Sequence, residues 1–271
     1  MKHYLTGAFL TAALICSSYA QTELRSLDKP TGWISDPTIV LEENEGVLTA
    51  AGQVRLISSQ TFDVDPSKTY TISVELRHVA GLPRTAYVGV FPLDEKGEFI
   101  SPAQVNAKKG SDTVLTKPVK KGDKEIWIKE NKLWNPVLQN IPSALAIAWD
   151  TKEDYSDLPN KNNSYNSIVS SETVNGEMKI TLKSPMRKDL PAGTKVRYHF
   201  DGGYMYSAGS SVPGRSDFRQ FTGSVTGMNQ IGYSANVWPK GTKKFRLLIL
   251  ANWRGNNSTK SEIRNAKVTV K

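Results

Sequence analysis

The 271-residue sequence has very little of the chemistry that thiol and metal sites need. It contains one cysteine, Cys16, and three histidines. Cys16 falls inside an expected leader, so the rest of the chain has no thiol and no disulfide. No zinc-ligand spacing, phosphate-binding loop or dinucleotide fingerprint occurs. We therefore expect no cofactor, no metal site and no covalent cross-link, and a fold stabilised by its core and by backbone pairing.

Long hydrophobic runs are also missing beyond the first 20 residues. The best later run, residues 245–251, has only the length of a strand, so no transmembrane segment is expected. Residues 1–20 combine Lys2, an apolar stretch over 5–15 and small residues before Gln21, which indicates a signal peptide cleaved after Ala20. A secreted or periplasmic protein of bacterial type is expected. A buried N-terminal helix and a lipidated Cys16 are weaker alternatives, the latter because Ile15 suits a lipobox poorly.

Acidic residues are fewer than basic ones, 26 against 35, which gives a net charge of +9. The excess has three interpretations: solubility, attraction to an acidic glycan or cell surface, and binding of nucleic acid. The densest basic runs, residues 117–124 and 240–246, lie beside turns, and no nucleic-acid motif occurs. Nucleic acid is therefore not an expected partner.

The sequence does contain stretches in which apolar and polar residues alternate with a period of two. In residues 62–76 a turn around Pro66 leads into a stretch where Tyr70, Ile72 and Val74 alternate with polar residues, which predicts a half-buried strand. No amphipathic helix longer than two turns appears. Turns rich in Gly, Pro, Asn and Asp separate the expected strands, and together they predict an all-β sandwich. Those strands are residues 47–50, 54–62, 69–79, 85–92, 113–115, 125–129, 144–149, 167–174, 178–182, 195–200, 219–226, 233–237, 243–251 and 262–270.

Two resemblances suggest how these strands are organised. The pieces 53–56, 62–76, 86–91, 245–252 and 262–270 resemble the β-jelly-roll of carbohydrate-binding modules in secreted glycan-active proteins. Motifs at 121–128, 133–136, 146–149, 175–182 and 191–196 resemble a small β-barrel-like module found inserted in extracellular proteins. The resemblances imply a jelly-roll β-sandwich made of discontinuous segments, 21–112 and 199–271, interrupted by a small β module at 113–198. The carbohydrate-binding family often holds a structural calcium with paired acids on its last strand, but Arg264 and Asn265 stand here and do not support one.

Candidate binding residues come from two aromatic segments. Residues 201–211 are rich in Gly and Ser and carry Tyr204 and Tyr206, and residues 252–257 place Trp253 beside Arg254 and Asn256. Aromatic rings stack on sugar rings while amides and guanidinium groups bond hydroxyls, so these five residues form the expected ligand site. A purely structural role on the sandwich rim is the alternative for each aromatic residue. Trp33 is a weaker candidate, and the other tryptophans are expected to be structural.

Evidence for catalysis is thin. Arg197, Tyr198 and His199 could serve β-elimination on a polyuronate, but adjacent strand residues face opposite sides, so Tyr198 and His199 cannot share a site. Asp154, Asp157 and Asn160 lack calcium-loop spacing and indicate an exposed turn. No catalytic residue is assigned.

The sequence thus predicts an exported, non-catalytic protein that binds a polysaccharide or a surface glycan, the acidic kind included. A polysaccharide lyase acting on an acidic glycan and a structural envelope or appendage protein remain alternatives.

Overall fold

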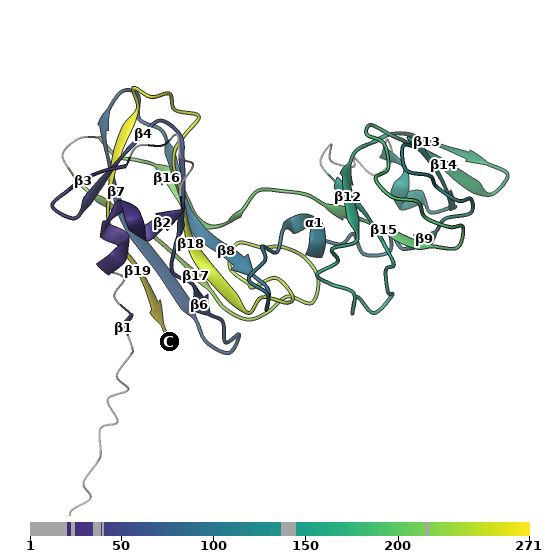
Figure 1. Cartoon of the computed structure of the whole chain (residues 1–271), viewed down its shortest axis with the longest axis horizontal. Helices are drawn as coiled ribbons and strands as arrows, with labels where there is room; N and C mark the ends of the chain where they lie inside the picture. Colours follow the sequence, from purple (N-terminus) through teal and green to yellow (C-terminus); the bar gives the residue numbers. More distant parts are fainter. Residues whose placement is uncertain (1–20, 23–24, 35–38, 40, 137–144, 215–216) are drawn as a thin grey trace, which may run out of the picture.

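The computed structural model describes residues 21–22, 25–34, 39, 41–136, 145–214 and 217–271 (Figure 1). Every pair of strands in it is antiparallel, and helices are limited to a few short turns, so the all-β prediction is confirmed. The short helices are η1 (Arg25–Asp28), η2 (Pro30–Gly32), α1 (Pro102–Val105) and η3 (Lys132–Trp134). Within the part of the chain that is described, no helix is long and apolar enough to cross a membrane. The expected signal peptide, residues 1–20 with Cys16, lies outside the described residues.

Two sheets pack face to face into a sandwich, here called the outer sandwich. The first sheet runs in the order β17 (Arg219–Val225), β7 (Tyr70–Ala80), β19 (Lys260–Val270), β4 (Val47–Ala51), β3 (Leu41–Asn44), with β1 (Gln21–Thr22) paired to β19. The second runs β16 (Met205–Ser211), β8 (Thr85–Leu93), β18 (Lys244–Trp253), β5 (Val54–Ser58), β2 (Trp33–Ile34), with β6 (Phe62–Asp63) paired to β18. Early and late strands thus alternate within both sheets, as a discontinuous jelly-roll requires.

Period-two alternation places the core between these sheets. On β7, Ile72, Val74 and Leu76 are fully buried, and they face the buried Val88 and Val90 of β8 within one hydrophobic cluster. Full burial of such a side chain contributes about 1.5–3 kcal/mol. The opposite face of β7 is polar, and on it Glu75 pairs with the Nε of Arg264 at 2.7 Å. The half-buried strand expected at 70–76 is therefore present. Both strands that pair with it, β17 and β19, come from late in the sequence.

A second pair of sheets forms what we call the middle lobe. One sheet runs β10 (Glu125–Lys129), β14 (Glu177–Leu182), β13 (Ile168–Val174), and the other β12 (Asn163–Asn166), β11 (Leu145–Trp149), β15 (Lys195–Phe200), β9 (Thr113–Val114). They enclose a separate hydrophobic cluster around the fully buried Trp134, Ile147 and Ile180. In Figure 1 this lobe lies beside the outer sandwich and is joined to it through the region of α1. The domain boundaries expected at 112/113 and 198/199 stay a prediction.

Polar contacts join the middle lobe to the segments that enter and leave it. Lys161 of the middle lobe bonds Asp94 at 2.5 Å and also reaches Glu98, both from the turn after β8. The Nζ of Lys240 donates to the carbonyl oxygen of Tyr155 at 2.7 Å. These bonds hold the lobe against the end of the outer sandwich where β8 and β18 meet.

Three expectations about local structure were wrong. Residues 233–237 form no strand, because Ser234 and Val237 make an isolated bridge that closes a turn over residues 235–236. The stretch 201–211, interpreted as a loop, contains β16 from Met205 onward. Strands β3 and β12 were not expected at all, since their polar residues hide the alternation.

Candidate functional site

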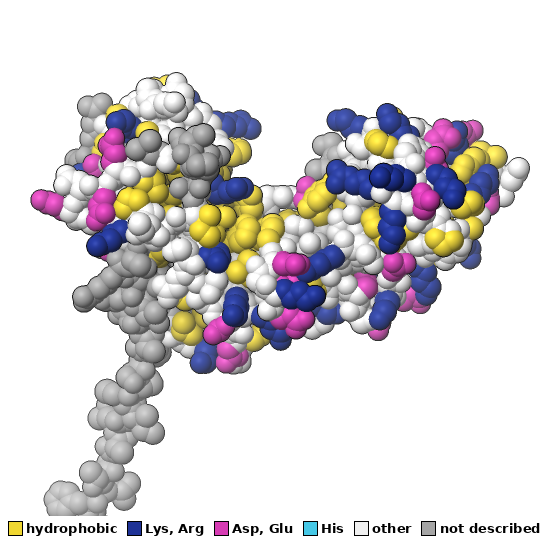
Figure 2. Space-filling view, in the orientation of Figure 1, with side chains coloured by type: hydrophobic (Ala, Val, Ile, Leu, Met, Phe, Trp, Pro, Cys, Tyr) yellow, Lys and Arg dark blue, Asp and Glu magenta, His cyan; other side chains and the backbone are white. Residues whose placement is uncertain are grey.

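A groove of about 770 Å³ lies on the face of the second sheet that points away from the core. Its described walls combine aromatic and aliphatic side chains with Gln53, just before β5, and Arg55 of β5. In the orientation of Figure 2, hydrophobic side chains gather over the region of β8 and β18. The groove is lined by Ile34, Ile39, Gln53, Arg55, Ile57, Tyr87, Gly203, Tyr204, Tyr206, Leu250 and Trp253.

Strand alternation explains why these residues share one face. On β8, Val88 points into the core while its neighbour Tyr87 lines the groove. On β18 the same holds for Ile249 and Leu250, and β5 contributes Arg55 from between two core residues. Because β8 and β5 both pair with β18, their outward side chains lie side by side across the sheet.

Strand β16 completes the groove because glycines allow a close approach. A Cβ at Gly89 would lie 1.9 Å from the carbonyl oxygen of Met205, so only glycine lets β16 pair with β8 here. A Cβ at Gly209 would lie 2.4 Å from the ring of Tyr87, which rests over that glycine. A bulge between Tyr206 and Ala208 shifts the register of this pair. Residue 206 thereby comes to lie beside Tyr87 on the outward face.

The aromatic rings form a continuous cluster. The ring centroids of Tyr87 and Tyr206 are 5.1 Å apart, and those of Tyr206 and Tyr204 are 6.2 Å apart. Tyr204 continues to Phe91 at 5.9 Å, and Phe91 stacks on Phe99 at 4.0 Å with the planes only 13° apart. These separations are typical of favourable aromatic pairs, so each ring is held by its neighbours. The outward face of β8 and β16 is therefore a firm aromatic platform.

A single guanidinium group lies over this platform. The Arg55 Cζ is 5.2 Å from the centroid of the Tyr204 ring, and its Nη1 donates a hydrogen bond to the Tyr204 hydroxyl. Burial, aided by the neighbouring Tyr204 hydroxyl, raises the pKa of Tyr206 to about 12. The Tyr206 hydroxyl thus stays protonated at neutral pH, able to donate as well as accept. Among the described lining residues, Arg55 carries the only formal charge.

A smaller hollow of about 310 Å³ adjoins the groove at Tyr204. The two spaces share Gly203, Tyr204 and Tyr206 as common walls. The smaller one extends to Tyr233 and Ser234, in the segment before β18. The shared walls give the site an elongated outline along β16.

Three of the five residues expected to bind ligand lie in the groove wall. Tyr204 and Tyr206 form its aromatic side, and Trp253, at the end of β18, is 37% exposed and lines it from the other side. Arg254 and Asn256 lie outside the lining. Arg254 stacks over the Trp253 ring at 5.7 Å and its backbone N–H donates to the Oε1 of Gln53. The ligand-binding role of all five residues stays a prediction.

The side-chain oxygen of Asn256 is already occupied. It accepts hydrogen bonds from the backbone N–H and the hydroxyl of Ser258, at 3.1 and 2.6 Å. This is the local turn that asparagine commonly forms two residues ahead. Its contribution to the loop is therefore conformational.

Sequence reasoning missed Arg55, Tyr87 and Gln53. The signal in the sequence was the alternation of residues in 54–57 and 86–91, in which every second side chain must face away from the core. Using it requires knowing which half faces the core, and that depends on pairing with a strand that comes much later in the chain.

The candidates for catalysis are buried structural residues. Arg197 and His199 are both fully buried, and the Nε of Arg197 donates to the Nε2 of His199 at 3.1 Å. Arg197 also pairs with Asp157 at 2.7 Å and with Asp112 at 3.2 Å. Tyr198 lies on the opposite face and donates to the carbonyl oxygen of Leu133, as the strand geometry predicted. A polymer cannot reach this histidine.

The side-chain oxygens of the acidic turn at 154–160 do not converge on one point where a cation could bind. Asp157 is engaged with Arg197 and with the side-chain amide of Asn160, while Asp154 accepts from the backbone N–H of Ser156. Nowhere in the described ranges do three His, Cys, Asp or Glu side chains cluster as metal ligands. Trp33 is a core residue whose Nε1 donates to the carbonyl oxygen of Leu27 at 2.8 Å.

Comparison with known proteins gives limited guidance. No family model matches the sequence, and no curated protein matches it. Among solved structures, one match is the CBM22-1 and GH10 modules of Clostridium thermocellum endo-1,4-β-D-xylanase 10B complexed with xylohexaose, with 11% identity and a TM-score of 0.36. That match covers 89% of this chain but 26% of the xylanase chain. Another is a structure described as "CBM4 structure and function", with 8% identity, a TM-score of 0.33 and coverage of 89% of this chain and 79% of the other.

Proposed function

We propose that this protein binds a glycan in the groove on the second sheet of the outer sandwich. The observation that carries the proposal is the aromatic wall formed by Tyr87, Tyr204, Tyr206 and Trp253, with Arg55 and Gln53 at its edge. The apolar face of a pyranose ring packs on aromatic rings, and its hydroxyls bond to tyrosine, amide and guanidinium groups. The rings are fixed by one another before a ligand arrives, which lowers the ordering cost of binding.

The elongated outline favours a polymer over a single sugar. The groove of about 770 Å³ and the adjoining hollow of about 310 Å³ share the Tyr204 and Tyr206 walls. Two adjacent spaces that share these walls can hold successive sugar units of a chain. The proposed ligand is therefore a polysaccharide or the extended glycan of a cell surface.

Glycan-array binding of the purified chain, followed by titration calorimetry on the best ligand, tests this. Tyr206→Ala and Trp253→Ala are expected to weaken binding at least tenfold, since truncating an aromatic residue at the centre of a binding site costs about 2 kcal/mol or more. The matched control is Tyr165→Ala, which removes an exposed tyrosine of β12 that belongs neither to the groove nor to a cation–π contact among the described residues. Unchanged affinity in both groove variants, with unchanged melting temperatures, would exclude the groove as the site.

Export and absence of catalysis are part of the same proposal. Residues 1–20 support export by their composition, and N-terminal sequencing of protein recovered from the medium or periplasm would show whether cleavage follows Ala20. The burial of His199 supports a binding role over a lyase. Release of unsaturated products from polyuronates by the purified chain would contradict it.

The division into domains is also proposed. The separate hydrophobic clusters of the outer sandwich and the middle lobe support a module at 113–198 inserted between 21–112 and 199–271. Limited proteolysis is expected to cut near both boundaries and to give three resistant fragments, of which 21–112 and 199–271 stay associated through the outer core.

A further inference from the structure

Two basic loops of the middle lobe lie side by side. Residues 117–124 and 183–190 are joined by backbone hydrogen bonds, with Val119 and Leu190 exchanging two at 2.8 Å. Farther along, the N–H of Gly122 donates to the carbonyl oxygen of Met186 at 2.9 Å, and that of Leu182 to Lys124 at 2.7 Å. Segments that are distant in sequence therefore form one surface, which we call the basic loops.

Positive charge dominates this surface. Its cations are all exposed, and the acids within the same loops are only Asp123 and Asp189. Figure 2 shows Lys and Arg side chains spread across the middle lobe. The cations are Lys117, Lys120, Lys121, Lys124, Lys183, Arg187 and Lys188.

Few of these charges are neutralised within the protein. Lys120 pairs with Asp189 at 3.8 Å and Lys117 with Glu177 at 3.7 Å, both in exposed geometry. Asp123 is turned toward its own loop and accepts from the backbone N–H of Lys120. The other five cations of the basic loops form no ion pair with any described residue. Like charges held together this way repel, and a polyanion relieves that repulsion.

Neighbouring tryptophans support two of the cations. The Nζ of Lys117 lies 3.2 Å from the centroid of the Trp127 ring, and that of Lys188 lies 5.8 Å from the Trp149 ring. Such contacts keep an ammonium group at the surface while leaving its other side open to solvent. Two of the seven charges are thus held at the surface, while the other side chains stay free to adjust to a ligand.

We propose that the basic loops bind the carboxylate or sulfate groups of an acidic polysaccharide. Six of the seven cations are lysines, compact and mobile charges that suit anionic groups spaced along a flexible polymer. Among the described residues of the middle lobe, η3 has a single turn, and no helix is long enough to fill the major groove of a duplex. The choice of a polysaccharide over other polyanions rests on the glycan-binding function proposed for the groove.

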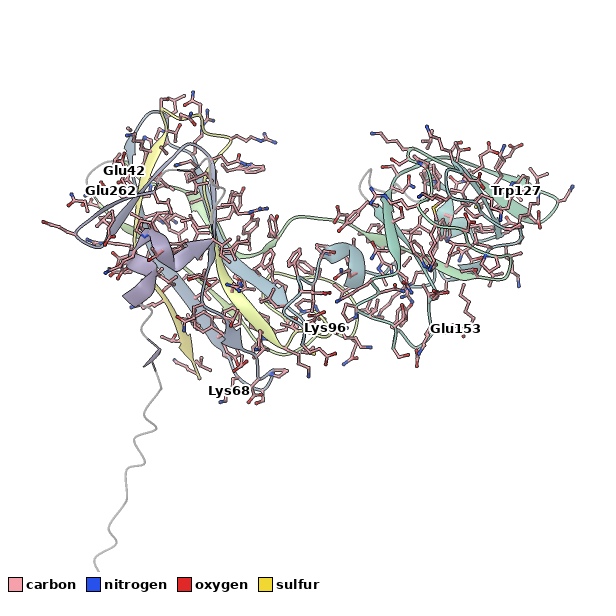
Figure 3. All side chains as sticks on the ribbon, viewed as in Figure 1. Glu42, Lys68, Lys96, Trp127, Glu153 and Glu262 are labelled. Carbon is pink, nitrogen blue, oxygen red and sulfur yellow. The ribbon has the colours of Figure 1, made fainter. Side chains whose placement is uncertain are left out.

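Binding to dextran sulfate, compared with unmodified dextran of the same length, tests this inference on the whole chain. The variant Lys121→Gln/Lys124→Gln/Lys183→Gln removes three unpaired cations. The matched control Lys68→Gln/Lys96→Gln/Lys244→Gln lowers the net charge equally at exposed positions outside the middle lobe, two of them labelled in Figure 3. Circular dichroism and melting temperature verify that both variants are folded.

The first variant is expected to weaken dextran sulfate binding about tenfold or more at low salt, and to reduce the salt dependence of binding by about one charge per lysine removed. The control is expected to retain most of the affinity. Equal losses in both variants would overturn the proposal, because net charge alone would then explain binding. Tighter binding to duplex DNA than to dextran sulfate or polygalacturonate, at equal salt, would also overturn it.

Failure of the groove is distinguishable from failure of the basic loops. Tyr206→Ala is expected to leave the dextran sulfate affinity and its salt dependence unchanged, because Tyr206 belongs to the outer sandwich. A loss confined to Tyr206→Ala would refute a role for the basic loops while supporting the groove.

Discussion

Protonation of His199 on acidification should destabilise the protein by an amount that the structure allows us to calculate. The Nε2 of His199 accepts from the Nε of Arg197, and its Nδ1 carries the proton that bonds the carbonyl oxygen of Ala103 at 2.8 Å. A second proton would have to sit on Nε2, facing the guanidinium group. Burial, reinforced by the charge of Arg197, lowers the pKa of His199 from 6.5 to about 4. The folded protein therefore keeps this ring neutral where the unfolded chain protonates it.

The sign and size of the effect follow from this shift. Because the folded-state pKa is the lower one, the unfolded chain binds more protons between pH 6.5 and about 4. The stabilising contribution is full above pH 6.5 and is lost as the pH falls toward 4. A difference of roughly 2.5 pH units corresponds to about 3 kcal/mol of unfolding free energy. Asp112 also faces Arg197, and burial raises the pKa of its carboxyl group, so it opposes part of the loss.

Urea unfolding across the interval from pH 6.5 to 4 measures this contribution when the wild type is compared with His199→Gln. Glutamine can still accept from Arg197 but does not titrate, so the variant should be less stable at neutral pH and should lose less stability on acidification. The carboxylates are common to both proteins and cancel in the comparison. Parallel curves over this interval would refute the assignment of the pH dependence to His199, and with it the buried neutral state of this ring.

Three further substitutions probe single features of the fold. Asp157→Ala should lower the unfolding free energy by about 3 kcal/mol in urea titrations, because it leaves the buried Arg197 with one carboxylate partner fewer; a loss no larger than that of an exposed Asp154→Ala control would contradict this. Gly89→Ala should cost about 1–3 kcal/mol and alter the near-ultraviolet dichroism of the tyrosine cluster, since its Cβ would meet the backbone of β16; a wild-type spectrum and melting temperature would refute the close approach. Asn252→Ala should lower the unfolding free energy in urea titrations by on the order of 1–3 kcal/mol, because its buried side chain bonds Ala50, Gly52 and Ser261. The control Trp253→Ala, at the neighbouring exposed position, should lower it far less.

The strands that the sequence predicted well are those with a strict alternation of large apolar residues. Residues 70–76 are of this kind and lie in β7, while residues 245–251 were recognised as a nearly continuous apolar run of strand length and lie in β18. Strand β16 was missed because its small and polar residues carry little hydrophobic signal. Its pairing depends on Gly89 of a different strand, a long-range condition that local patterns do not contain.

The candidate site was predictable only in part for the same reason. Tyr204, Tyr206 and Trp253 stand out as aromatic residues among glycine, serine and asparagine, and that contrast is local. Tyr87 and Arg55 lie in ordinary alternating strands, where one half of the residues must face outward. Which alternate set of residues faces outward and lines the groove depends on how β18 pairs with both β5 and β8. That pairing exists only in the assembled sheet.

The aromatic cluster includes residues from both segments that connect the outer sandwich to the middle lobe. Phe99 lies between β8 and α1, on the path into the middle lobe, and Tyr204 lies between β15 and β16, on the path out. Their rings are 5.8 Å apart and both join the cluster that ends at Tyr87. The bonds from Lys161 to Asp94 and from His199 to Ala103 fix these same connecting segments against the middle lobe. The middle lobe therefore determines where one end of the aromatic platform lies, and replacing it with a short turn would release Phe99 and Tyr204 even though the outer core stayed intact.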